Sequence, residues 1–320
     1  MADYRYILTN PPLTRGTESV MLIFSLIAVH SNVLALYITV FRLRLRTASV
    51  GLMAIIALTD ILTALAIILN EILKYATSRE ILNNDLFCQY FGMISMLFPM
   101  SSVDGIGLLS LLRALSIVQN IEIQGLYWYL AMGVMFVYNL IINVLAVSNN
   151  IMKVTPSQIY CHALYDENTY SKHFSSLLLA KFFIMFIISI VSYICITIRY
   201  YKTVSRLKSK RGSSSECFVE VNPTLTCQRM IIFRLIAFLL MYMICFVPQL
   251  ATTAYTVITK TPRSAIADAV SGATISLSLL ANSVFVLFYQ IESREIILNM
   301  MPRWIYTPTV CSKPYVLGDF

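Results

Sequence analysis

The sequence predicts an all-α membrane protein, a bundle of seven transmembrane helices followed by a short amphipathic eighth helix. Hydrophobic residues make up 58% of the chain and charged residues only 12%, whereas about a quarter of a soluble globular chain is charged. The charges are also clustered. Long uncharged runs alternate with short polar segments, which is the pattern of helical membrane proteins.

Seven mainly apolar runs divide the chain. We expect an extracellular N-terminus at residues 1–17, the seven-helix bundle at 18–290, the amphipathic helix at 291–302 and a cytoplasmic tail at 303–320. The expected spans are 18–41, 48–74, 88–118, 126–147, 174–200, 230–258 and 264–290. Apolar residues recur at helical spacing after the seventh span, at Ile296, Ile297, Met300 and Met301. That spacing is typical of a helix lying on a membrane surface.

The third span is expected to be the centre of the bundle. Arg113 lies 25 residues after Cys88, a distance of roughly 37 Å along a helix, which is enough to cross a bilayer with some tilt. Asp104 and several serines lie at membrane depth, where polar side chains are costly and tend to face protein.

The distribution of basic residues predicts the orientation. The net charge is +8, and most of the loop Lys and Arg residues follow the first and fifth spans or lie in the tail. The positive-inside rule then puts the N-terminus outside and the tail in the cytoplasm of a multi-pass membrane protein. This clustering indicates the lipid bilayer as a partner and argues against nucleic acid.

Cys88 and Cys161 are the only cysteines that this orientation places outside the cell. The outside is oxidising, which allows them to form a disulfide. Two free thiols are the alternative. Cys311 follows the amphipathic segment, where a cysteine is a candidate for palmitoylation.

Two other classes of membrane protein fit the sequence less well. A seven-helix transporter or channel would favour an internal repeat or broken helices, and the sequence shows neither clearly. A membrane enzyme would require a cluster of catalytic side chains, but the histidines are dispersed, with only His30 in a span. The chain has no Walker loop, dinucleotide-binding glycine pattern or Cys/His metal spacing.

Short motifs fall on successive spans in a fixed order. They are 31–34 (SNVL), 57–60 (ALTD), 110–118 (SLLRALSIV), 245–248 (CFVP) and 282–285 (NSVF), with Tyr193 near the inner end of the fifth span. They resemble the GNxL, LAxxD, SxDRYLAIV, CWxP and NPxxY motifs of the rhodopsin-like family of G-protein-coupled receptors. The resemblance covers about residues 18–301.

The chain also departs from the family pattern. Leu112 and Ala114 replace the acid and the tyrosine beside Arg113, and Phe246 stands in place of the usual tryptophan. Ser283 and Val286 replace the proline and tyrosine of the seventh helix. The resemblance therefore implies a receptor that binds an extracellular ligand and activates a heterotrimeric G protein, with a non-coupling decoy receptor as the alternative.

The resemblance also implies roles for individual residues at the inner face. Arg113, Tyr193 and Arg229 are expected at the G-protein contact, although Arg113 is alternatively an anchor that reaches the lipid headgroups. Pro248 is expected to kink the sixth helix.

A polar cluster is expected at mid-membrane from Asn32, Asp60, Ser102 and Asn282, because polar groups at that depth need one another or water. It is interpreted either as a hydrogen-bonded structural cluster or as a sodium site at Asp60 and Ser102. No other cofactor is expected.

Family position suggests a ligand pocket at Glu71, Ser95, Met96, Lys181, Phe246, Gln249 and Ser276. A lysine buried in the fifth span needs a partner, and two are open for Lys181, an anionic ligand or an internal acid such as Glu71. Ser95 stands where amine receptors carry an aspartate, which disfavours a biogenic amine. Ser276 stands where opsins carry the retinal lysine, which argues against a retinal Schiff base. Small molecules, lipids, odorants and peptides remain open.

Overall fold

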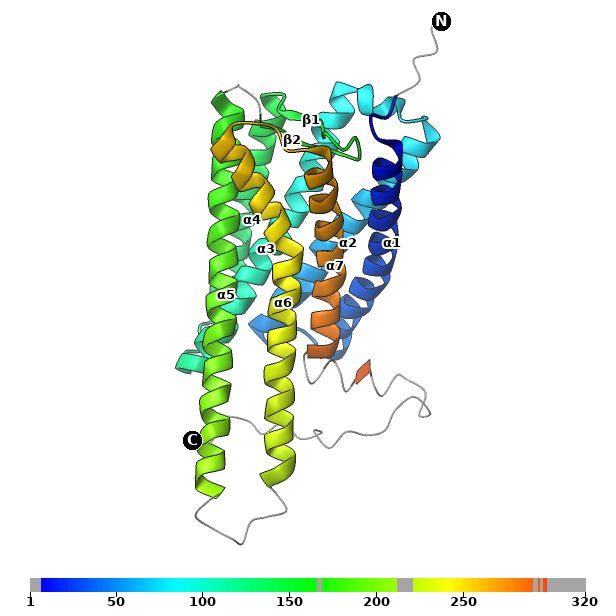
Figure 1. The fold of residues 1–320 in the computed structure, drawn as a ribbon. Helices are drawn as coiled ribbons and strands as arrows, with labels where there is room; N and C mark the ends of the chain where they lie inside the picture. Colours follow the sequence, from blue (N-terminus) through cyan, green and yellow to red (C-terminus); the bar gives the residue numbers. More distant parts are fainter. Residues whose placement is uncertain (1–6, 166–168, 212–220, 290–292, 294–295, 298–320) are drawn as a thin grey trace, which may run out of the picture.

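Seven helices long and apolar enough to cross a membrane form the bundle in Figure 1, so the predicted fold is confirmed. The computed structural model describes residues 7–165, 169–211, 221–289, 293, 296 and 297. The helices are α1 (Pro11–Tyr37), continued by a π-helical turn (Ile38–Arg42), α2 (Ala48–Ala76), α3 (Asp85–Gln119), α4 (Gly125–Ser148), α5 (Thr169–Arg211), α6 (Val221–Thr259) and α7 (Ala265–Tyr289). The predicted tail, most of the amphipathic helix and the palmitoylation candidate Cys311 lie outside the described residues.

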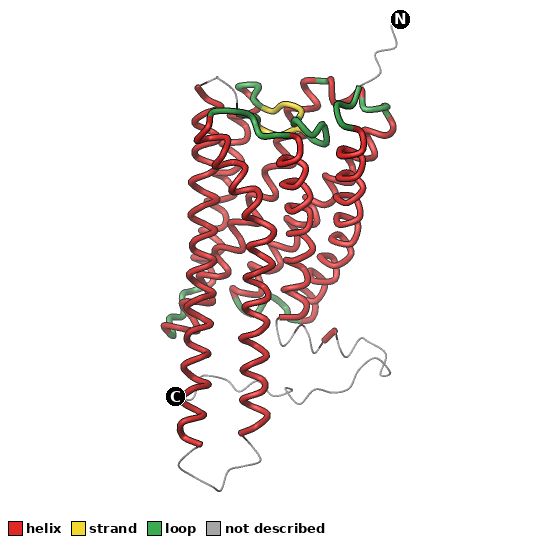
Figure 2. Tube along the Cα trace, viewed as in Figure 1, coloured by secondary structure: helices red, strands yellow, loops and turns green. Residues whose placement is uncertain are grey.

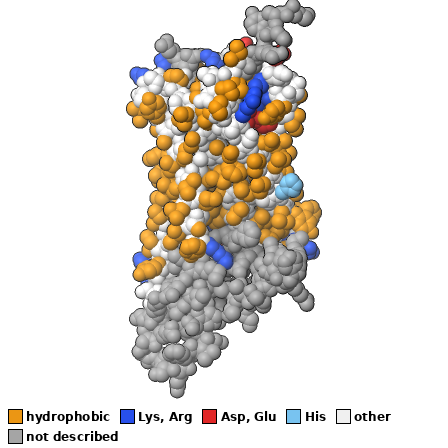
Figure 3. All heavy atoms as spheres, turned by 45° about the vertical axis from the view of Figure 1, so that its right-hand side comes forward, with side chains coloured by type: hydrophobic (Ala, Val, Ile, Leu, Met, Phe, Trp, Pro, Cys, Tyr) orange, Lys and Arg blue, Asp and Glu red, His pale blue; other side chains and the backbone are white. Residues whose placement is uncertain are grey.

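Hydrophobic side chains cover the middle of the face shown in Figure 3, and the Lys and Arg side chains visible there lie toward its two ends. Many of the exposed residues are large and apolar, among them Ile23, Leu69 and Ile184. A soluble protein rarely exposes so much contiguous apolar surface. This surface suits contact with lipid tails, and the chain is a multi-pass membrane protein.

The first helix begins at Pro11, earlier than the predicted start at residue 18. The Asn10 side chain accepts a hydrogen bond from the Leu13 amide at 3.4 Å, which caps the helix. Proline suits the first helical turn, where its missing N–H has no partner to lose. The hydropathy of the spans does not report such a cap, so the helix was predicted too short.

The fifth and sixth helices extend beyond the other five, as Figure 1 shows. We expected a polar inner segment at 201–229, but α5 continues to Arg211 and α6 begins at Val221. Lys and Arg are good helix formers, so the helices continue where the apolar sequence stops. The end of the bundle that they leave is called the extension end.

The opposite end carries a two-stranded hairpin and is called the hairpin end (Figure 2). Strand β1 (Met152–Val154) pairs antiparallel with β2 (Cys161–Ala163). Cys161 forms a disulfide with Cys88 at the start of α3, with 5.3 Å between the two Cα atoms. The predicted disulfide is confirmed, and it fixes the hairpin over the bundle.

Helix α3 lies at the centre, as expected. It packs against α2, α4 and α5 and contacts both strands. Asp104, at its middle, is fully buried. Because α3 connects the disulfide at one end with Arg113 near the other, it links the two ends of the molecule.

A cavity at the hairpin end and an arginine at the extension end

A cavity lies in the hairpin half of the bundle, with about 710 Å³ of space between its lining atoms when its opening to solvent is included. Helices α1, α2, α3, α5, α6 and α7 contribute to its wall, and the segment 155–163, called here the roof segment, contributes Tyr160 and His162. The lining residues are Met21, Thr63, Ile67, Asn70, Phe91, Ser95, Met96, Pro99, Met100, Tyr160, His162, Phe182, Gln249, Gly272, Ile275 and Ser276. The wall is mainly apolar and rich in methionine.

Four of the seven predicted pocket residues line this cavity, namely Ser95, Met96, Gln249 and Ser276. Phe246 instead lines a smaller neighbouring pocket of about 260 Å³, which shares Phe182 and Gln249 with the cavity. Glu71 and Lys181 are absent from both linings among the described residues. Both side chains are bonded to partners within the protein instead.

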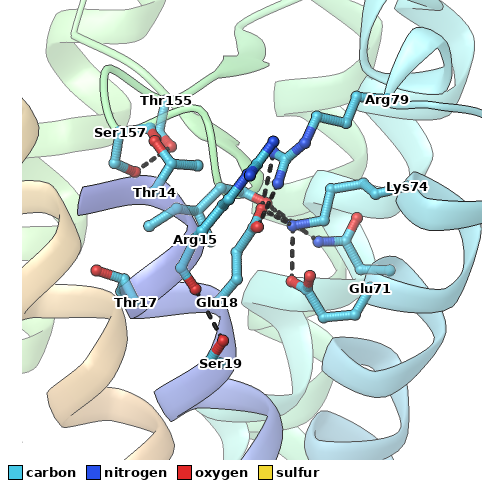
Figure 4. A network of polar contacts seen from close by, with 12 residues as sticks. Thr14, Arg15, Thr17, Glu18, Ser19, Glu71, Lys74, Arg79, Thr155 and Ser157 are labelled. Carbon is cyan, nitrogen blue, oxygen red and sulfur yellow. Dashed lines mark hydrogen bonds and ion pairs between the residues drawn. The ribbon is translucent and has the colours of Figure 1, made fainter. Parts of the chain in front are cut away.

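Glu71 belongs to a buried network of charges between α1, α2 and the roof segment (Figure 4). Lys74 Nζ donates to Glu18 Oε1 and Glu71 Oε1, each at 2.6 Å, and to the Ile159 carbonyl at 2.7 Å. Arg79 donates to both carboxylate oxygens of Glu18. Two acids and two bases thus neutralise one another, and the network ties the roof segment to two helices.

The sequence left the partner of Lys181 open, and the structure shows that this partner is Asp104 rather than Glu71. Lys181 Nζ lies 2.8 Å from Asp104 Oδ2 and also donates to Asn139 Oδ1. Asn139 Nδ2 donates to the same Asp104 oxygen at 2.8 Å and to Ser101 Oγ at 3.2 Å. The lysine therefore joins α3, α4 and α5 inside the protein.

Helix α7 holds the roof segment from the other side. Asp268 accepts hydrogen bonds from the Ser157 hydroxyl and from Tyr160 OH, the latter at 3.1 Å. Arg263 Nε pairs with Asp268 Oδ1 at 3.1 Å, and Arg263 Nη2 contacts His162 Nδ1 at 3.1 Å. Burial and the Arg263 guanidinium lower the pKa of His162 to about 4, so its imidazole is neutral near pH 7.

The polar cluster at mid-membrane forms from three of its four predicted members. Ser102 Oγ donates to Asp60 Oδ1 at 2.6 Å, and Asn282 Nδ2 donates to Asp60 Oδ2 at 2.9 Å. Asn32 is bonded instead to the backbone, through the carbonyls of Ala28 and Leu279 at 3.0 Å. Each Asp60 oxygen thus accepts a hydrogen bond, as a structural cluster requires, and the sodium ion stays a prediction.

Arg113 lies at the extension end of α3, with residues of three other helices around it. Its guanidinium carbon is 4.9 Å from the centre of the Phe285 ring, and Nη2 is 3.3 Å from Met53 Sδ. Tyr193, which is buried, has a side-chain hydrogen bond with Arg113. Two of the three predicted coupling residues therefore meet. Arg229 lies on α6, with its side chain outside the described part of the chain.

Sequence reasoning missed the polar residues that line the cavity besides the serines and Gln249. Asn70, Tyr160 and His162 were not singled out. Asn70 directly precedes Glu71 in α2, and a polar residue at membrane depth is a signal for a functional position. His162 follows the disulfide cysteine, so its place over the bundle was implied by the bond at Cys161.

Comparison with known proteins identifies the family. The family model described as "7 transmembrane receptor (rhodopsin family)" matches residues 31–285, which is most of the chain. The comparison with curated proteins finds no match. The matched region runs from the SNVL motif of α1 to Phe285 of α7, and so includes the polar cluster, Arg113 and all of the cavity lining except Met21. The chain therefore belongs to the rhodopsin family of seven-transmembrane receptors.

Proposed function

We propose that this receptor binds a small molecule in the cavity at the hairpin end and activates a heterotrimeric G protein at the extension end. Concave pockets with mainly apolar walls and a few polar groups are the usual binding sites of small molecules. The contact for the G protein is proposed at Arg113, Tyr193 and the basic stretches of α5 and α6.

Helices α3 and α6 each reach both the cavity and the surroundings of Arg113, and this observation supports the proposal most directly. Helix α3 lines the cavity with Ser95 and Met96 and carries Arg113 at its other end. Helix α6 lines the cavity with Gln249, and its Phe238 packs on Phe285, the ring beside Arg113, with 3.8 Å between ring centres. A ligand that binds two arrangements of these helices with different affinity shifts the balance between them.

Pro248 gives α6 a place to bend between its two contacts. Proline removes one backbone hydrogen bond from a helix interior, and Pro248 directly precedes the cavity residue Gln249. The proposed kink would let the half of α6 that carries Phe238 swing relative to the half at the cavity. This movement would uncover Arg113 for a G protein.

We further propose that the hairpin end faces the outside and that the receptor acts at the plasma membrane. The disulfide at Cys88 and Cys161 is suited to an oxidising compartment. The basic residues after α1 and along the ends of α5 and α6 lie at the extension end, as the positive-inside rule expects of a cytoplasmic face.

Nucleotide exchange on a panel of purified G proteins tests the coupling role. We expect the wild-type receptor to stimulate exchange without added ligand and Arg113→Ala to remove this stimulation. Lys153→Ala is the matched control, because it removes the same charge from an exposed position on β1 at the hairpin end.

Exchange that is equal in wild type and Arg113→Ala would contradict the role of this residue. If neither protein stimulates exchange on any G protein, the non-coupling receptor that Leu112 and Ala114 suggest becomes the better proposal. A solute-flux measurement in liposomes then tests the transporter alternative.

A further inference from the structure

We propose that the ligand is an uncharged, mainly apolar molecule that donates one hydrogen bond to the side chain of Asn70. This inference deepens the proposed function, since it names the class of molecule that the same cavity takes. It argues against an anionic ligand at Lys181, one of the two alternatives that the sequence left open. The inference follows from the partners of the charged and polar side chains in the hairpin half of the bundle.

The cavity presents no charged side chain among the described residues that line it. Glu71, which directly follows the cavity residue Asn70, and Lys74, one turn further on, neutralise each other within the network of Figure 4. Arg263 is paired with Asp268, and Lys181 with Asp104. A charged ligand would give up its hydration without gaining a counter-charge in the wall, which makes its binding unfavourable.

His162 is the one residue in this lining whose side-chain type ordinarily titrates near neutral pH, and here it is held in its neutral form. The Arg263 guanidinium lies 3.1 Å from its Nδ1 and opposes a second positive charge there. The roof segment therefore adds a polar surface without charge. The wall of the cavity remains uncharged and is dominated by methionine and aromatic side chains.

Most polar groups of the wall are already bonded to protein. The hydroxyls of Thr63 and Ser276 donate to carbonyls one turn earlier in their own helices. Ser95 Oγ donates to the Gly92 and Cys161 carbonyls, and Tyr160 OH donates to Asp268. These hydroxyl groups already donate to protein acceptors, so they contribute mainly to the shape of the cavity.

Asn70 is different, because one of its polar atoms has no partner in the described part of the chain. Its side chain is 3% exposed, and its Nδ2 donates to the Ile159 carbonyl at 3.3 Å. A carbonyl only accepts, so this bond fixes the amide with its N–H toward the roof segment. Oδ1 then remains without a hydrogen bond among the described atoms. A buried acceptor without a donor is costly, and a ligand hydroxyl or N–H would remove that cost.

A matched set of probes tests both parts of the proposal on the purified full-length receptor in lipid nanodiscs. Farnesol, farnesyl methyl ether, farnesoic acid and farnesylamine share one apolar chain and differ only in the end group. Each is added at the same mole fraction in the lipid, and the rise in melting temperature gives the affinity. No G protein is present, so the result is independent of coupling.

We expect farnesol to bind wild type about tenfold more tightly than the methyl ether, since only the alcohol donates a hydrogen bond. The acid and the amine should bind more weakly than either. In Asn70→Leu the alcohol should lose its advantage over the ether. Thr63→Val is the matched control and should keep that advantage, because the Thr63 hydroxyl is bonded to its own helix.

Partition of the probes into lipid is controlled by Ile275→Trp, which fills the cavity with a larger side chain and should abolish all four shifts. Tighter binding of the acid or the amine, equal binding of alcohol and ether to wild type, or no shift with any probe would each overturn the proposal. The comparison in wild type needs no variant, so it stands even if Asn70→Leu does not fold.

Discussion

The two ends of this receptor are held together by different kinds of interaction. At the hairpin end, a disulfide, a four-residue charge network and the Asp268 contacts bind the roof segment to α1, α2, α3 and α7. At the extension end, the packing is largely aromatic, with Tyr193, Phe238 and Phe285 against one another and beside Arg113.

This difference indicates which end is built to move. Covalent bonds and buried charge pairs have strict geometry, and removing one partner leaves a costly charge or polar group behind. Aromatic contacts are less directional and survive when helices slide or tilt. We therefore expect the hairpin end to keep its shape while the extension end changes, and the following variants test that contrast.

The largest effect is expected from the disulfide. Cys88→Ser and Cys161→Ser should each remove about 4 kcal/mol of stability, because the bond closes a loop with a sequence separation of 73. Surface expression should fall sharply in each single variant. The double variant should be little worse than either, and additive losses would argue that the two cysteines do not act as one bond.

The second largest loss of stability is expected from the buried Lys74. Lys74→Ala should lower stability by about 3 kcal/mol, because Glu18 and Glu71 lose a shared counter-charge in a buried site. Lys153→Ala removes an exposed lysine and should change the melting temperature little. A combined Lys74→Met and Glu71→Gln variant should recover most of the loss. A mild effect of Lys74→Ala would mean that the network contributes little.

The mid-membrane cluster should respond more weakly. Ser102→Ala removes the donor to Asp60 Oδ1 and should cost about 2 kcal/mol, the value of a hydrogen bond to a charged group. As a structural cluster, it should show the same loss in NaCl and in KCl. A loss confined to NaCl would instead support the predicted sodium ion.

A smaller change is expected at the extension end. Tyr193→Phe keeps the ring contacts and removes the hydrogen bond with Arg113, at a cost of about 1 kcal/mol. Tyr201→Phe, at an exposed position on the same helix, is the control. If Tyr193→Phe destabilises the receptor as much as Lys74→Ala does, the contrast between the two ends fails.

Acid should act on the roof segment through His162. The unfolded chain binds a proton near pH 6.5, whereas the folded imidazole stays neutral down to about pH 4, beside Arg263, Asp268 and Tyr160. Stability should therefore fall as the pH drops through this window and level off below it. Melting curves of wild type and His162→Phe test this, and a drop of equal size in both would assign the effect to other groups.

The sequence predicted the fold well because membrane crossing is a local property. An uncharged run of about 20 residues reveals a span without reference to any other part of the chain. The start of α1 was missed because it depends on the cap at Asn10, and the lengths of α5 and α6 because a helix outside the membrane need not be apolar.

Pairing between helices was harder to predict. Lys181 was recognised as needing a partner, but nothing along the chain shows that Asp104 and Asn139 face it across the bundle. The Glu71 and Lys74 pair was accessible, since residues three apart lie on one helix face. Asn70 became a candidate only when the structure showed that this cavity-lining residue has a buried oxygen without a hydrogen bond among the described atoms.

The roof segment also has a consequence for the rates of binding. Ile159, Ser157 and Cys161 are tied to different helices, so the segment leaves the cavity only when several bonds break together. These ties are formed within the protein, and we expect them to raise the barrier for entry and exit alike while leaving the equilibrium nearly unchanged. A molecule that reaches the cavity should stay there for a long time, so that a brief exposure to ligand is followed by a signal that outlasts it.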